Sequence, residues 1–488
     1  MDPPVSPEDL PEAPKDPPVA SENPPATPEG TDCQDQPAQN SSGAAESYYQ
    51  ADYFYDWTSP SPLQVTGAWS CFEKSGVKPN NFVKGCKWAP DGACLLTNSE
   101  DATLRIFAVP PSLWSLQLDW QEMTELQPLV AVKERAFVND FAWYPGMTSQ
   151  EPVTCCFAVC CKDTPIHLWN AFNGELQATY QAINHVEEVK GAHSLAFEPM
   201  GNLLYTGFNK MVRLFDVSRP GRQVENRPTH TKKEGGQAGI ISCFAFEATH
   251  HSVYAAGSYG RTIGIYGMKE GDYICEMEGH RGGVTHVKFS PCGNRLYSGA
   301  RMDNEILCWD LRNPGVVLAR MRRVVATHQR MYFEVSSSGR WLVTGNSNGV
   351  VSVWDMEQEP QTEILLPAQF FQAHGDCVVG VALHPSLPLL ATGSGQRHFP
   401  QLAEEDDATL FKPPSCGDCS IRLWWLQPAN SRDSIEQTIQ PSPDQPTSDH
   451  SPQQTPVQQP PHSTPVQSPN SALFLPSSED QPPSPMNS

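Results

Sequence analysis

The sequence lacks the long apolar run, about 18 residues, that a membrane-spanning helix requires. It begins with prolines and acidic residues instead of a basic segment followed by an apolar one, so we expect no signal peptide. The G-x-S-x-G, phosphate-loop and H-E-x-x-H motifs of common enzyme classes are also missing. These absences predict a non-enzymatic protein with no membrane contact, no cofactor and no small-molecule ligand.

Basic residues are scarce, since 33 Lys and Arg face 55 Asp and Glu, for a formal net charge of -22. Residues 1–60 carry -11 of this charge and residues 428–488 carry -5, so only -6 remains in between. Both ends are rich in Pro, Ser and Gln or Glu and poor in aliphatic residues, so they cannot bury enough surface to offset chain entropy. We predict disordered tails at 1–56 and 428–488, and one folded domain at 57–427.

The tails carry two further signals. Many serines and threonines precede a proline, and we single out Ser6, Ser59, Ser61 and Ser442 as candidate phosphorylation sites, although such pairs also arise by chance in Pro-rich segments. Six aromatic residues between Tyr48 and Trp57 interrupt the first tail. They indicate a docking segment, either on the folded domain itself or on a partner.

The 15 cysteines are odd in number and irregularly spaced, which favours reduced thiols packed in strands of a cytosolic or nuclear protein. Cys416 and Cys419 have the spacing of metal ligands, but no convincing second pair accompanies them. We therefore predict no metal site.

A repeat dominates the middle of the chain, and its clearest copy is Gly279–Arg312. Residues 284–289, 295–299 and 305–310 alternate as strands, and turns separate them. A Gly-His pair precedes the first strand and Trp-Asp ends the third, which is typical of one blade of a β-propeller. The spacing allows a buried hydrogen-bonded chain through His280, Ser298, Asp303 and Trp309.

The same pattern occurs seven times. The residues before each first turn align as Trp88, Trp143, Phe197, Phe246, Phe289, Phe333 and Leu383. The residues that end each third strand align as Phe107, Trp169, Phe215, Tyr266, Trp309, Trp354 and Trp424. The sequence therefore predicts an all-β fold, a seven-bladed WD40 β-propeller.

The copies differ in their polar residues. The seventh repeats the whole polar chain as His374, Thr392, Asp418 and Trp424. The first two keep the turn aspartate, as Asp101 and Asp163. The third, fourth and sixth have Asn209, Gly260 and Asn348 there, so we expect apolar packing to hold these blades.

Closure and insertions complete the predicted fold. A closed ring needs the two ends of the domain to share a blade. We therefore expect a strand at Gln64–Phe72 to pair as the outer strand of the seventh blade. Among the insertions, Pro110–Ala136 predicts an outer-strand hairpin and Pro220–Gly239 a polar, basic loop. Arg397–Cys416 predicts a disordered acidic surface loop.

Several stretches resemble the telomerase Cajal body protein family. They include NFVKGCKWAPDGACLLTNS, FNKMVRLFDVSRPGR, GNRLYSGARMDNEILCWDLR and HPSLPLLATGSGQR. The likeness covers all seven copies, roughly residues 57–426, and extends to loops such as SRPGR and SGQR, while the tails do not match.

The resemblance implies a nuclear protein of Cajal bodies, and possible presence at telomeres. It implies binding to the CAB box of small Cajal body RNAs and telomerase RNA, which are H/ACA RNAs. It also implies telomerase proteins, Cajal body scaffold proteins and, during folding, the cytosolic chaperonin as partners.

Cations recur at turn and loop positions of the repeat. In a propeller, the turns between second and third strands and the loops leading into first strands emerge on one face. These positions hold one aromatic residue and several cations: Lys162, Lys210, Tyr259, Arg261, Arg281, Arg301, Arg322, Arg323 and Arg330, with Lys232 and Lys233 in the basic insertion. This combination suits a single-stranded RNA loop, which needs phosphate neutralisation and stacking. The alternative is scattered solvated charge.

Two other classes of protein stay open. Trp309-Asp310-Leu311-Arg312 fits the WDxR pattern with which substrate receptors of cullin-RING ubiquitin ligases bind their adaptor, although the pattern is common in WD repeats. A protein-only scaffold is the third possibility.

Overall fold

The computed structural model describes residues 57, 62–73, 81–114, 124–249, 252–358, 363–398 and 417–426. All of them belong to one compact unit of the chain, Met1–Ala429. Both predicted tails up to residue 56 and from 428, the four candidate phosphorylation sites and residues 399–416 of the acidic insertion lie outside the described residues. No described helix is long and apolar enough to cross a membrane.

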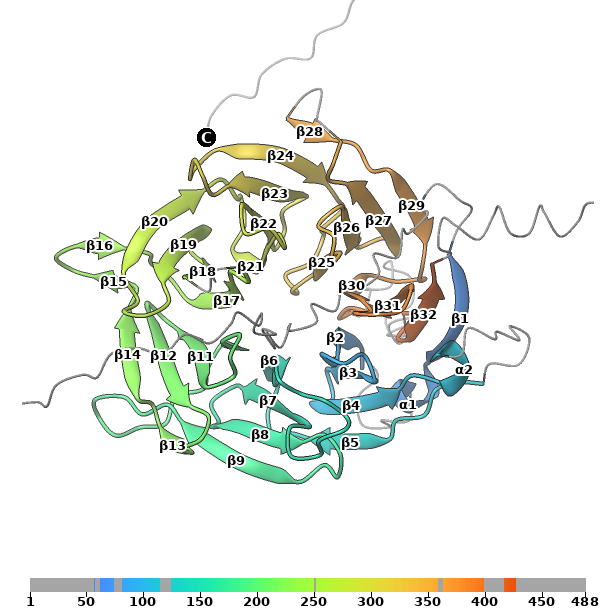
Figure 1. Ribbon diagram of the computed structural model, residues 1–488, viewed down its shortest axis with the longest axis horizontal. Coiled ribbons are helices and arrows are strands. Elements are labelled where there is room, and N and C mark those ends of the chain that lie inside the picture. Colours follow the sequence, from blue (N-terminus) through green and yellow to red (C-terminus); the bar gives the residue numbers. More distant parts are fainter. Residues whose placement is uncertain are drawn as a thin grey trace, which may run out of the picture. The chain divides into compact units, whose positions relative to one another are not determined.

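Seven of the sheets formed by the described strands are blades, each with four antiparallel strands, and they lie side by side around a common centre with their first strands innermost (Figure 1). Blade 1 contains β2 (Val83–Trp88), β3 (Cys94–Ser99), β4 (Thr103–Ala108) and β5 (Val130–Lys133). Blade 2 contains β6 (Val138–Trp143), β7 (Cys156–Cys161), β8 (Ile166–Asn170) and β9 (Leu176–Gln181). Blade 3 contains β10 (Ser194–Phe197), β11 (Leu203–Phe208), β12 (Met211–Asp216) and β14 (Glu225–Pro228).

Blade 4 contains β17 (Ile241–Phe246), β18 (Val253–Ser258), β19 (Thr262–Gly267) and β20 (Tyr273–Glu278). Blade 5 contains β21 (Val284–Phe289), β22 (Arg295–Ala300), β23 (Glu305–Asp310) and β24 (Val317–Arg322). Blade 6 contains β25 (Phe333–Val335), β26 (Trp341–Gly345), β27 (Val350–Asp355) and β29 (Gln369–Gln372). The seven-bladed propeller is confirmed, except that the first strand of blade 6 ends at Val335, two residues beyond the aligned Phe333.

Blade 7 closes the ring with strands from both ends of the domain. It contains β30 (Val378–Leu383), β31 (Leu389–Ser394), β32 (Ile421–Trp425) and, outermost, β1 (Leu63–Ala68). The β1–β32 pairing is antiparallel, with Leu63 opposite Trp425 and Ala68 opposite Ile421. This is the predicted closure, and it removes the free edges that an open ring would leave.

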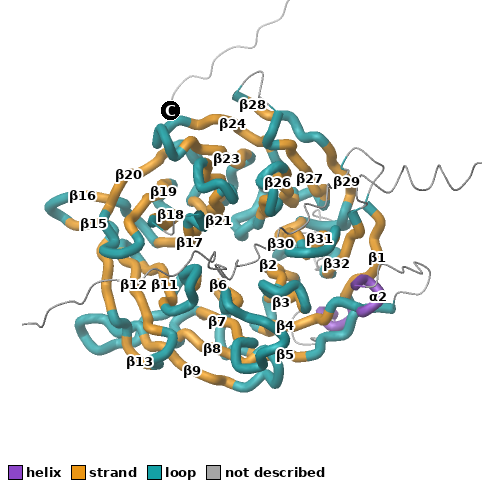
Figure 2. Tube along the Cα trace, viewed as in Figure 1, coloured by secondary structure: helices purple, strands orange, loops and turns teal. Residues whose placement is uncertain are grey.

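The predicted strand at Gln64–Phe72 is too long. The chain leaves β1 at Ala68 and turns into a short helix, α1 (Ser70–Glu73), shown in purple in Figure 2. The reason is a side-chain cap, because Glu125 Oε1 accepts hydrogen bonds from the backbone N–H of Trp69 (2.8 Å) and Ser70 (2.6 Å). The turn places the Phe72 ring in the core, 6.4 Å from the ring of Phe107.

Two insertions also differ from expectation. Pro110–Ala136 is no hairpin in its described part, which contains the short helix α2 (Pro111–Trp114) and the single outer strand β5. Pro220–Gly239 is more than a loop, because it supplies β14, the outer strand of blade 3. It also forms β13 (Gly221–Arg222) and the small hairpin of β15 (His230–Thr231) and β16 (Gly235–Gly236). A further strand, β28 (Ile364–Leu365), extends blade 5.

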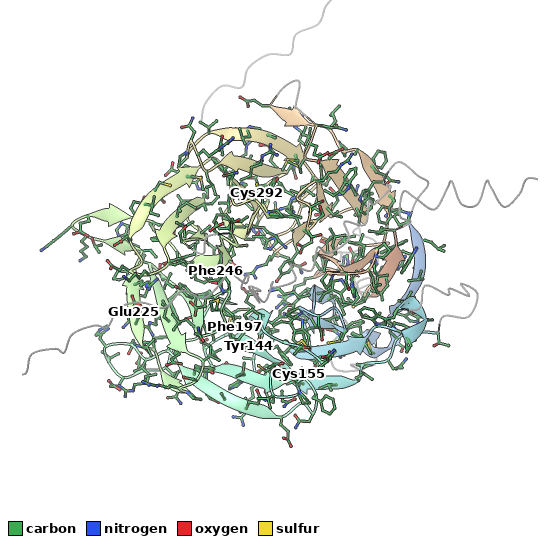
Figure 3. All side chains as sticks on the ribbon, viewed as in Figure 1. Tyr144, Cys155, Phe197, Glu225, Phe246 and Cys292 are labelled. Atoms are coloured by element: carbon green, nitrogen blue, oxygen red, sulfur yellow. The ribbon has the colours of Figure 1, made fainter. Side chains whose placement is uncertain are left out.

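Apolar side chains pack between neighbouring blades. Between blades 2 and 3, for example, Tyr144 and Phe197 meet edge to face with ring centroids 5.7 Å apart (Figure 3). Trp57 belongs to this packing, since it is 2% exposed and its ring centroid lies 6.4 Å from that of Trp341 in blade 6. The last aromatic residue of the predicted docking segment is therefore seated on the propeller itself.

Blades 5 and 7 contain buried polar chains between loop and strands. In blade 5, His280 Nδ1 is 2.9 Å from Asp303 Oδ2, its Nε2 is 2.7 Å from Ser298 Oγ, and Trp309 Nε1 donates to the same hydroxyl at 2.8 Å. Blade 7 repeats the arrangement with His374, Asp418, Thr392 and Trp424 at 3.3, 2.7 and 2.8 Å. Burial opposes ionisation of Asp303, but hydrogen bonds from His280 and the Arg281 N–H outweigh it and lower the pKa of that carboxyl.

Blade 4, expected to be held mostly by apolar packing, also contains a buried polar link. Gln237, which stands as far before Phe246 as His280 stands before Phe289, is fully buried. It accepts a hydrogen bond from Tyr266 Oη (2.9 Å) and donates to the carbonyl of Ala256 (2.8 Å). Because Ala256 has no hydroxyl, the longer glutamine spans the gap and replaces the serine-bridged chain of blade 5.

Candidate nucleic-acid interface

The turns between second and third strands are tied to the loops that connect successive blades. Arg301 N donates to Gly283 O (3.0 Å), Lys210 N to Gly239 O (2.8 Å) and Lys162 N to Phe137 O (3.0 Å). We call the surface formed by these turns and connecting loops the loop face. Each blade therefore presents its turn at the same end of its sheet, so residues from distant parts of the sequence share one surface.

Backbone conformation is also repeated among these turns. A left-handed residue occurs in six of the described turns, namely Ala102, Asp163, Lys210, Arg261, Met302 and Gly349. Glycine is the usual residue at positive φ, and other L-residues pay about 1–2 kcal/mol there. Lys210 (φ 57°) and Arg261 (φ 75°) thus retain long cationic side chains at strained positions in adjacent blades. Such strain is concentrated at functional sites in proteins.

The predicted cations lie on consecutive blades. Lys162 is on blade 2, Lys210 on blade 3, Arg261 on blade 4 and Arg301 on blade 5. Arg281 lies in the loop that leads into blade 5, and Lys232 and Lys233 form the tip of the β15–β16 hairpin. All are exposed except Arg301, which is partly buried. Within the part of the chain that the structure describes, none of the seven forms an ion pair with an acidic side chain.

Tyr259 and Arg301 join blades 4 and 5 on this surface. The Arg301 guanidinium carbon lies 4.3 Å from the centroid of the Tyr259 ring, a stacked cation–π contact. Asp303, only two residues from Arg301 in the sequence, is bonded to His280 and to the backbone N–H of Arg281. This aromatic–guanidinium pair therefore lies at the blade 5 end of the cationic run.

For two of the cations, Arg323 and Arg330, the predicted exposure on the loop face is wrong. Arg323 is 4% exposed, and its Nη1 donates to Thr344 Oγ1 at 3.0 Å. Arg330 points inward and pairs with Asp140 of blade 2 at 2.8 Å. The physical reason is that the loop 323–332 folds over the centre of the ring, where Val325 and Met331 pack in a buried apolar cluster with residues of blade 7. Arg322, at the end of β24, is exposed.

Arg330 and Asp140 both stay charged although they are buried, because each stabilises the charge of the other. Burial disfavours the Arg330 cation, but Asp140 outweighs that penalty and raises the pKa of the guanidinium. Burial likewise disfavours the Asp140 anion, but Arg330 and Lys87 together lower the pKa of the carboxyl. Arg330 Nη2 also donates to Ser242 O of blade 4 at 2.6 Å. These groups link blades across the centre of the ring and leave no charge free for a ligand.

Charges are compensated on the other side of the loop face. Arg397 pairs with Glu100, which connects blade 7 to blade 1, and Arg422 pairs with Asp418 at 2.8 Å. His398 lies 2.5 Å from Asp376. Blade 7 therefore presents paired charges, while exposed cations without an ion pair among the described residues lie over blades 2–5 and at Lys133, the last residue of the outer strand of blade 1.

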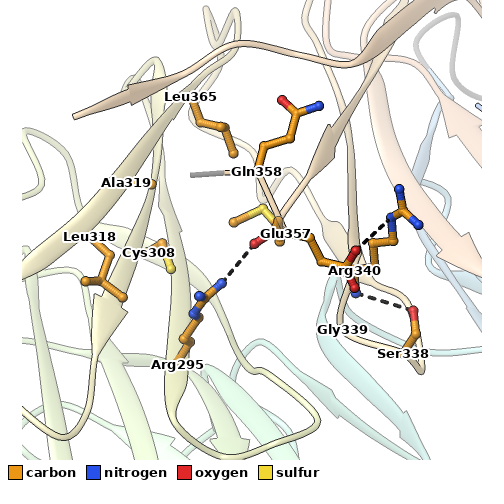
Figure 4. A pocket seen from close by; sticks show the side chains of 11 residues that line it. Arg295, Cys308, Leu318, Ala319, Ser338, Gly339, Arg340, Glu357, Gln358 and Leu365 are labelled. Atoms are coloured by element: carbon orange, nitrogen blue, oxygen red, sulfur yellow. Dashed lines mark hydrogen bonds and ion pairs between the residues drawn. The ribbon is translucent and has the colours of Figure 1, made fainter. Parts of the chain in front are cut away.

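The opposite face offers a weaker candidate. A cavity of about 570 Å³ lies between blades 5 and 6, with Arg295 and Arg340 among its lining residues (Figure 4). Arg295 donates to the Met356 carbonyl at 3.0 Å, and Arg340 pairs with Asp355 at 3.0 Å and Glu357 at 3.4 Å. Both cations are thus neutralised or hydrogen-bonded by the protein. The WDxR arginine, Arg312, is exposed on this side and donates to both carboxylate oxygens of Asp310, at 2.9 and 3.0 Å.

Metal binding finds no support in the described residues, which contain no group of three or more His, Cys, Asp or Glu that could hold an ion.

The sequence analysis did not single out Arg213 on β12, a cation next to the cationic run. The missed signal was an arginine four residues after the turn position where blades 1 and 7 have aspartate and blade 3 has Asn209.

Comparison with known proteins agrees with the fold and specifies the family. The WD domain, G-beta repeat family matches residues 75–107, 271–310 and 327–355. Telomerase Cajal body protein 1 of Mus musculus is 46% identical over 386 residues, which cover 77% of this chain and 71% of that protein. The Homo sapiens protein of the same name is 44% identical, with 79% of this chain and 71% of that protein covered.

A more distant relative extends the same pattern. The telomerase Cajal body protein 1 homolog of Drosophila melanogaster is 36% identical over 346 residues, which cover 69% of this chain and 61% of that protein. The matches to the mouse and human proteins are long enough to include the propeller as a whole. The chain belongs to the telomerase Cajal body protein 1 family.

Proposed function

We propose that this chain is a non-enzymatic RNA-binding protein of Cajal bodies. In this proposal it recognises the CAB box of small Cajal body RNAs and telomerase RNA and directs these particles to Cajal bodies in the nucleus. It thereby supports telomere maintenance, in contact with telomerase proteins and Cajal body scaffold proteins. The names of its relatives support the association with telomerase and Cajal bodies.

The observation that carries the RNA proposal is the run of unpaired cations on the loop face of blades 2–5, with the contact between Tyr259 and Arg301 at its blade 5 end. A hairpin loop exposes unstacked bases and closely spaced phosphates, which an aromatic residue and several cations can hold together. The propeller is acidic overall, so a local surplus of unneutralised cations favours a specific anionic ligand over scattered solvated charge.

The decisive experiment reverses two charges on the blades 4 and 5 part of this surface. We expect Arg261→Glu combined with Arg301→Glu to abolish binding of a CAB-box hairpin, measured by fluorescence anisotropy, while the thermal transition stays near that of the wild type. Binding by the wild type should weaken with salt, because phosphate contacts release counterions. The matched control is Arg219→Glu with Arg312→Glu, an equal charge change at two exposed arginines on the opposite face.

The outcomes separate the possible sites. If the folded double variant of Arg261 and Arg301 still binds the hairpin within a factor of about two, the proposed surface is wrong. The Lys232–Lys233 hairpin is then the next surface to test by the same charge reversal. Equal losses in the test and control variants would indicate non-specific attraction and would also contradict the proposal.

A second experiment distinguishes the RNA proposal from a ligase receptor or a protein-only scaffold. Partners of an RNA-containing particle should be lost from the purified protein after RNase treatment. A ligase receptor would keep its adaptor under the same treatment, and Arg312→Glu would release it. Retention of all partners after RNase would contradict the RNA proposal.

A further inference from the structure

One position of the third strand recurs in several blades and differs in its chemistry. It is the residue that pairs across the sheet with the threonine or serine of the second strand. In blades 1, 3, 5 and 7 this residue is Arg105, Arg213, Leu307 and Arg422. Strand register therefore makes the three arginines equivalent, and their surroundings can be compared directly.

Two of these arginines have an acidic partner four residues earlier in the chain. Arg105 Nη2 is 2.8 Å from Asp101 Oδ2, and Arg422 Nη2 is 2.8 Å from Asp418 Oδ2. Arg105 also donates to Ser99 Oγ at 2.6 Å. In blades 1 and 7 the arginine thus belongs to the internal structure of its own turn.

Blade 3 keeps the arginine but lacks the acid. Asn209 stands four residues before Arg213, and the turn is only two residues long, Asn209–Lys210. Among the described residues, Arg213 Nε and Nη1 are buried without a hydrogen-bond partner. The Arg213 guanidinium carbon lies 4.6 Å from the centre of the Phe208 ring. Burial lowers the pKa of this guanidinium, and no acidic group counteracts it.

An unpartnered, partly buried guanidinium destabilises a fold, because its N–H groups have lost water without gaining acceptors. Leucine at the same position of blade 5 illustrates the apolar solution. Arg213 is only partly buried and stands three residues after the exposed turn residue Lys210, so its guanidinium can turn towards the loop face without breaking a protein hydrogen bond.

We propose that Arg213 binds a backbone phosphate of the RNA on the loop face, together with Lys210, and so supplies from outside the anion that blade 3 lacks. This inference rests on the proposed RNA-binding function. The Phe208 ring supports the guanidinium from one side, and a phosphate offers acceptors to two of its parallel N–H groups. The bound hairpin therefore extends from the Tyr259–Arg301 stack of blades 4 and 5 to the boundary of blades 2 and 3.

The test is Arg213→Leu in the full-length chain, with thermal stability and hairpin binding measured on the same preparation. We expect the melting temperature to stay equal or rise, and affinity for the CAB-box hairpin to fall about tenfold to a hundredfold, the range of a charged hydrogen bond. The slope of log K against log salt should fall by about 0.7–0.9, which corresponds to one lost phosphate contact.

Two leucine variants provide matched controls. Arg105→Leu removes the equivalent, ion-paired arginine and should lower the melting temperature, because it leaves Asp101 buried without its partner. Arg219→Leu removes the same charge from the opposite face, where the side chain is 83% exposed, and should leave both stability and the salt slope unchanged.

The possible results are distinguishable. Unchanged hairpin binding by Arg213→Leu overturns the proposal, as does a loss of melting temperature like that of Arg105→Leu or a loss of affinity equal to that of Arg219→Leu. If the wild type binds no hairpin, the proposed function fails, and inorganic phosphate becomes the probe for Arg213. Phosphate should then raise the melting temperature of the wild type more than that of Arg213→Leu, and equal effects would overturn the anion site too.

Discussion

The boundary between blades 7 and 1 contains a buried histidine whose ionisation should control stability in acid. His384 is 3% exposed, and its Nε2 faces the Gly92 carbonyl of blade 1 at 2.9 Å. Its Nδ1 accepts hydrogen bonds from the backbone N–H of Ser386 (3.1 Å) and Leu387 (2.9 Å). Only a neutral ring protonated at Nε2 can make all three contacts, so a second proton would break two of them.

The expected magnitude follows from the pKa. Burial lowers the pKa of His384 from 6.5 to about 4, so between these values the unfolded chain binds more protons than the folded one. The contribution of His384 is therefore fully present above pH 6.5 and is lost as the pH falls. It amounts to about 2 kcal/mol lost by pH 5 and about 3 kcal/mol below pH 4.

The assay compares free energies of unfolding from urea titrations at pH 7.5 and pH 5.0 for the wild type and His384→Gln. The other acid-sensitive groups are present in both proteins, so their contributions cancel in the comparison. We expect the drop in stability to be smaller in the variant by about 2 kcal/mol. The exposed His328→Gln should leave the drop unchanged. An equal drop in wild type and His384→Gln would refute the assignment of a neutral, doubly accepting ring.

Three further changes test other features. Ser298→Ala leaves two buried groups of the blade 5 chain without a partner, and we expect thermal and urea unfolding to report a loss of about 2–4 kcal/mol; normal stability would contradict the hydrogen-bonded role. Trp57→Ala should cost about 3–5 kcal/mol, because it removes a large buried side chain from the outer packing. A loss below about 1 kcal/mol would mean that this residue does not help to hold the ring. Lys210→Gly should leave stability equal or raise it by up to about 1 kcal/mol, since it relieves a positive φ, while hairpin affinity falls; unchanged affinity would remove Lys210 from the interface.

Local pattern was sufficient to predict the blades. Side chains in the strands alternate with a period of two, and aromatic residues such as Trp309 recur at the ends of third strands. The sequence of each copy therefore predicts its own three inner strands. Closure by a strand preceding the first copy followed from the requirement that a ring leave no free edge.

Outer strands were predicted less well. β14 lies inside a polar, basic insertion, and β1 ends four residues before the predicted end at Phe72. Outer strands are partly solvent-exposed and are defined by pairing with a distant partner, so their own residues carry a weak periodic signal. The structural role of Gln237 was not predicted for a related reason. Its buried hydrogen bonds replace a hydroxyl-bridged chain only because Ala256, on another strand of the sheet, has no hydroxyl.

For the candidate interface, the sequence placed turn residues on one face but could not tell which cations are free. Arg330 occupies a position like those of the exposed cations, yet it reaches across the ring to Asp140. Arg301 stacks on Tyr259 instead of pairing with its near neighbour Asp303. Arg213 escaped notice, because a strand arginine has functional meaning only once its missing partner is known.

The sequence by itself determined the number of blades, the residues of the polar chains and the face on which the turn cations emerge, because these depend on spacing within one repeat. Only the tertiary structure decided which charges are neutralised, because an ion pair depends on distance between side chains that can be far apart in the chain. Asp140 and Arg330, brought together from blade 2 and the loop before blade 6, show that such partners are set by ring closure and packing.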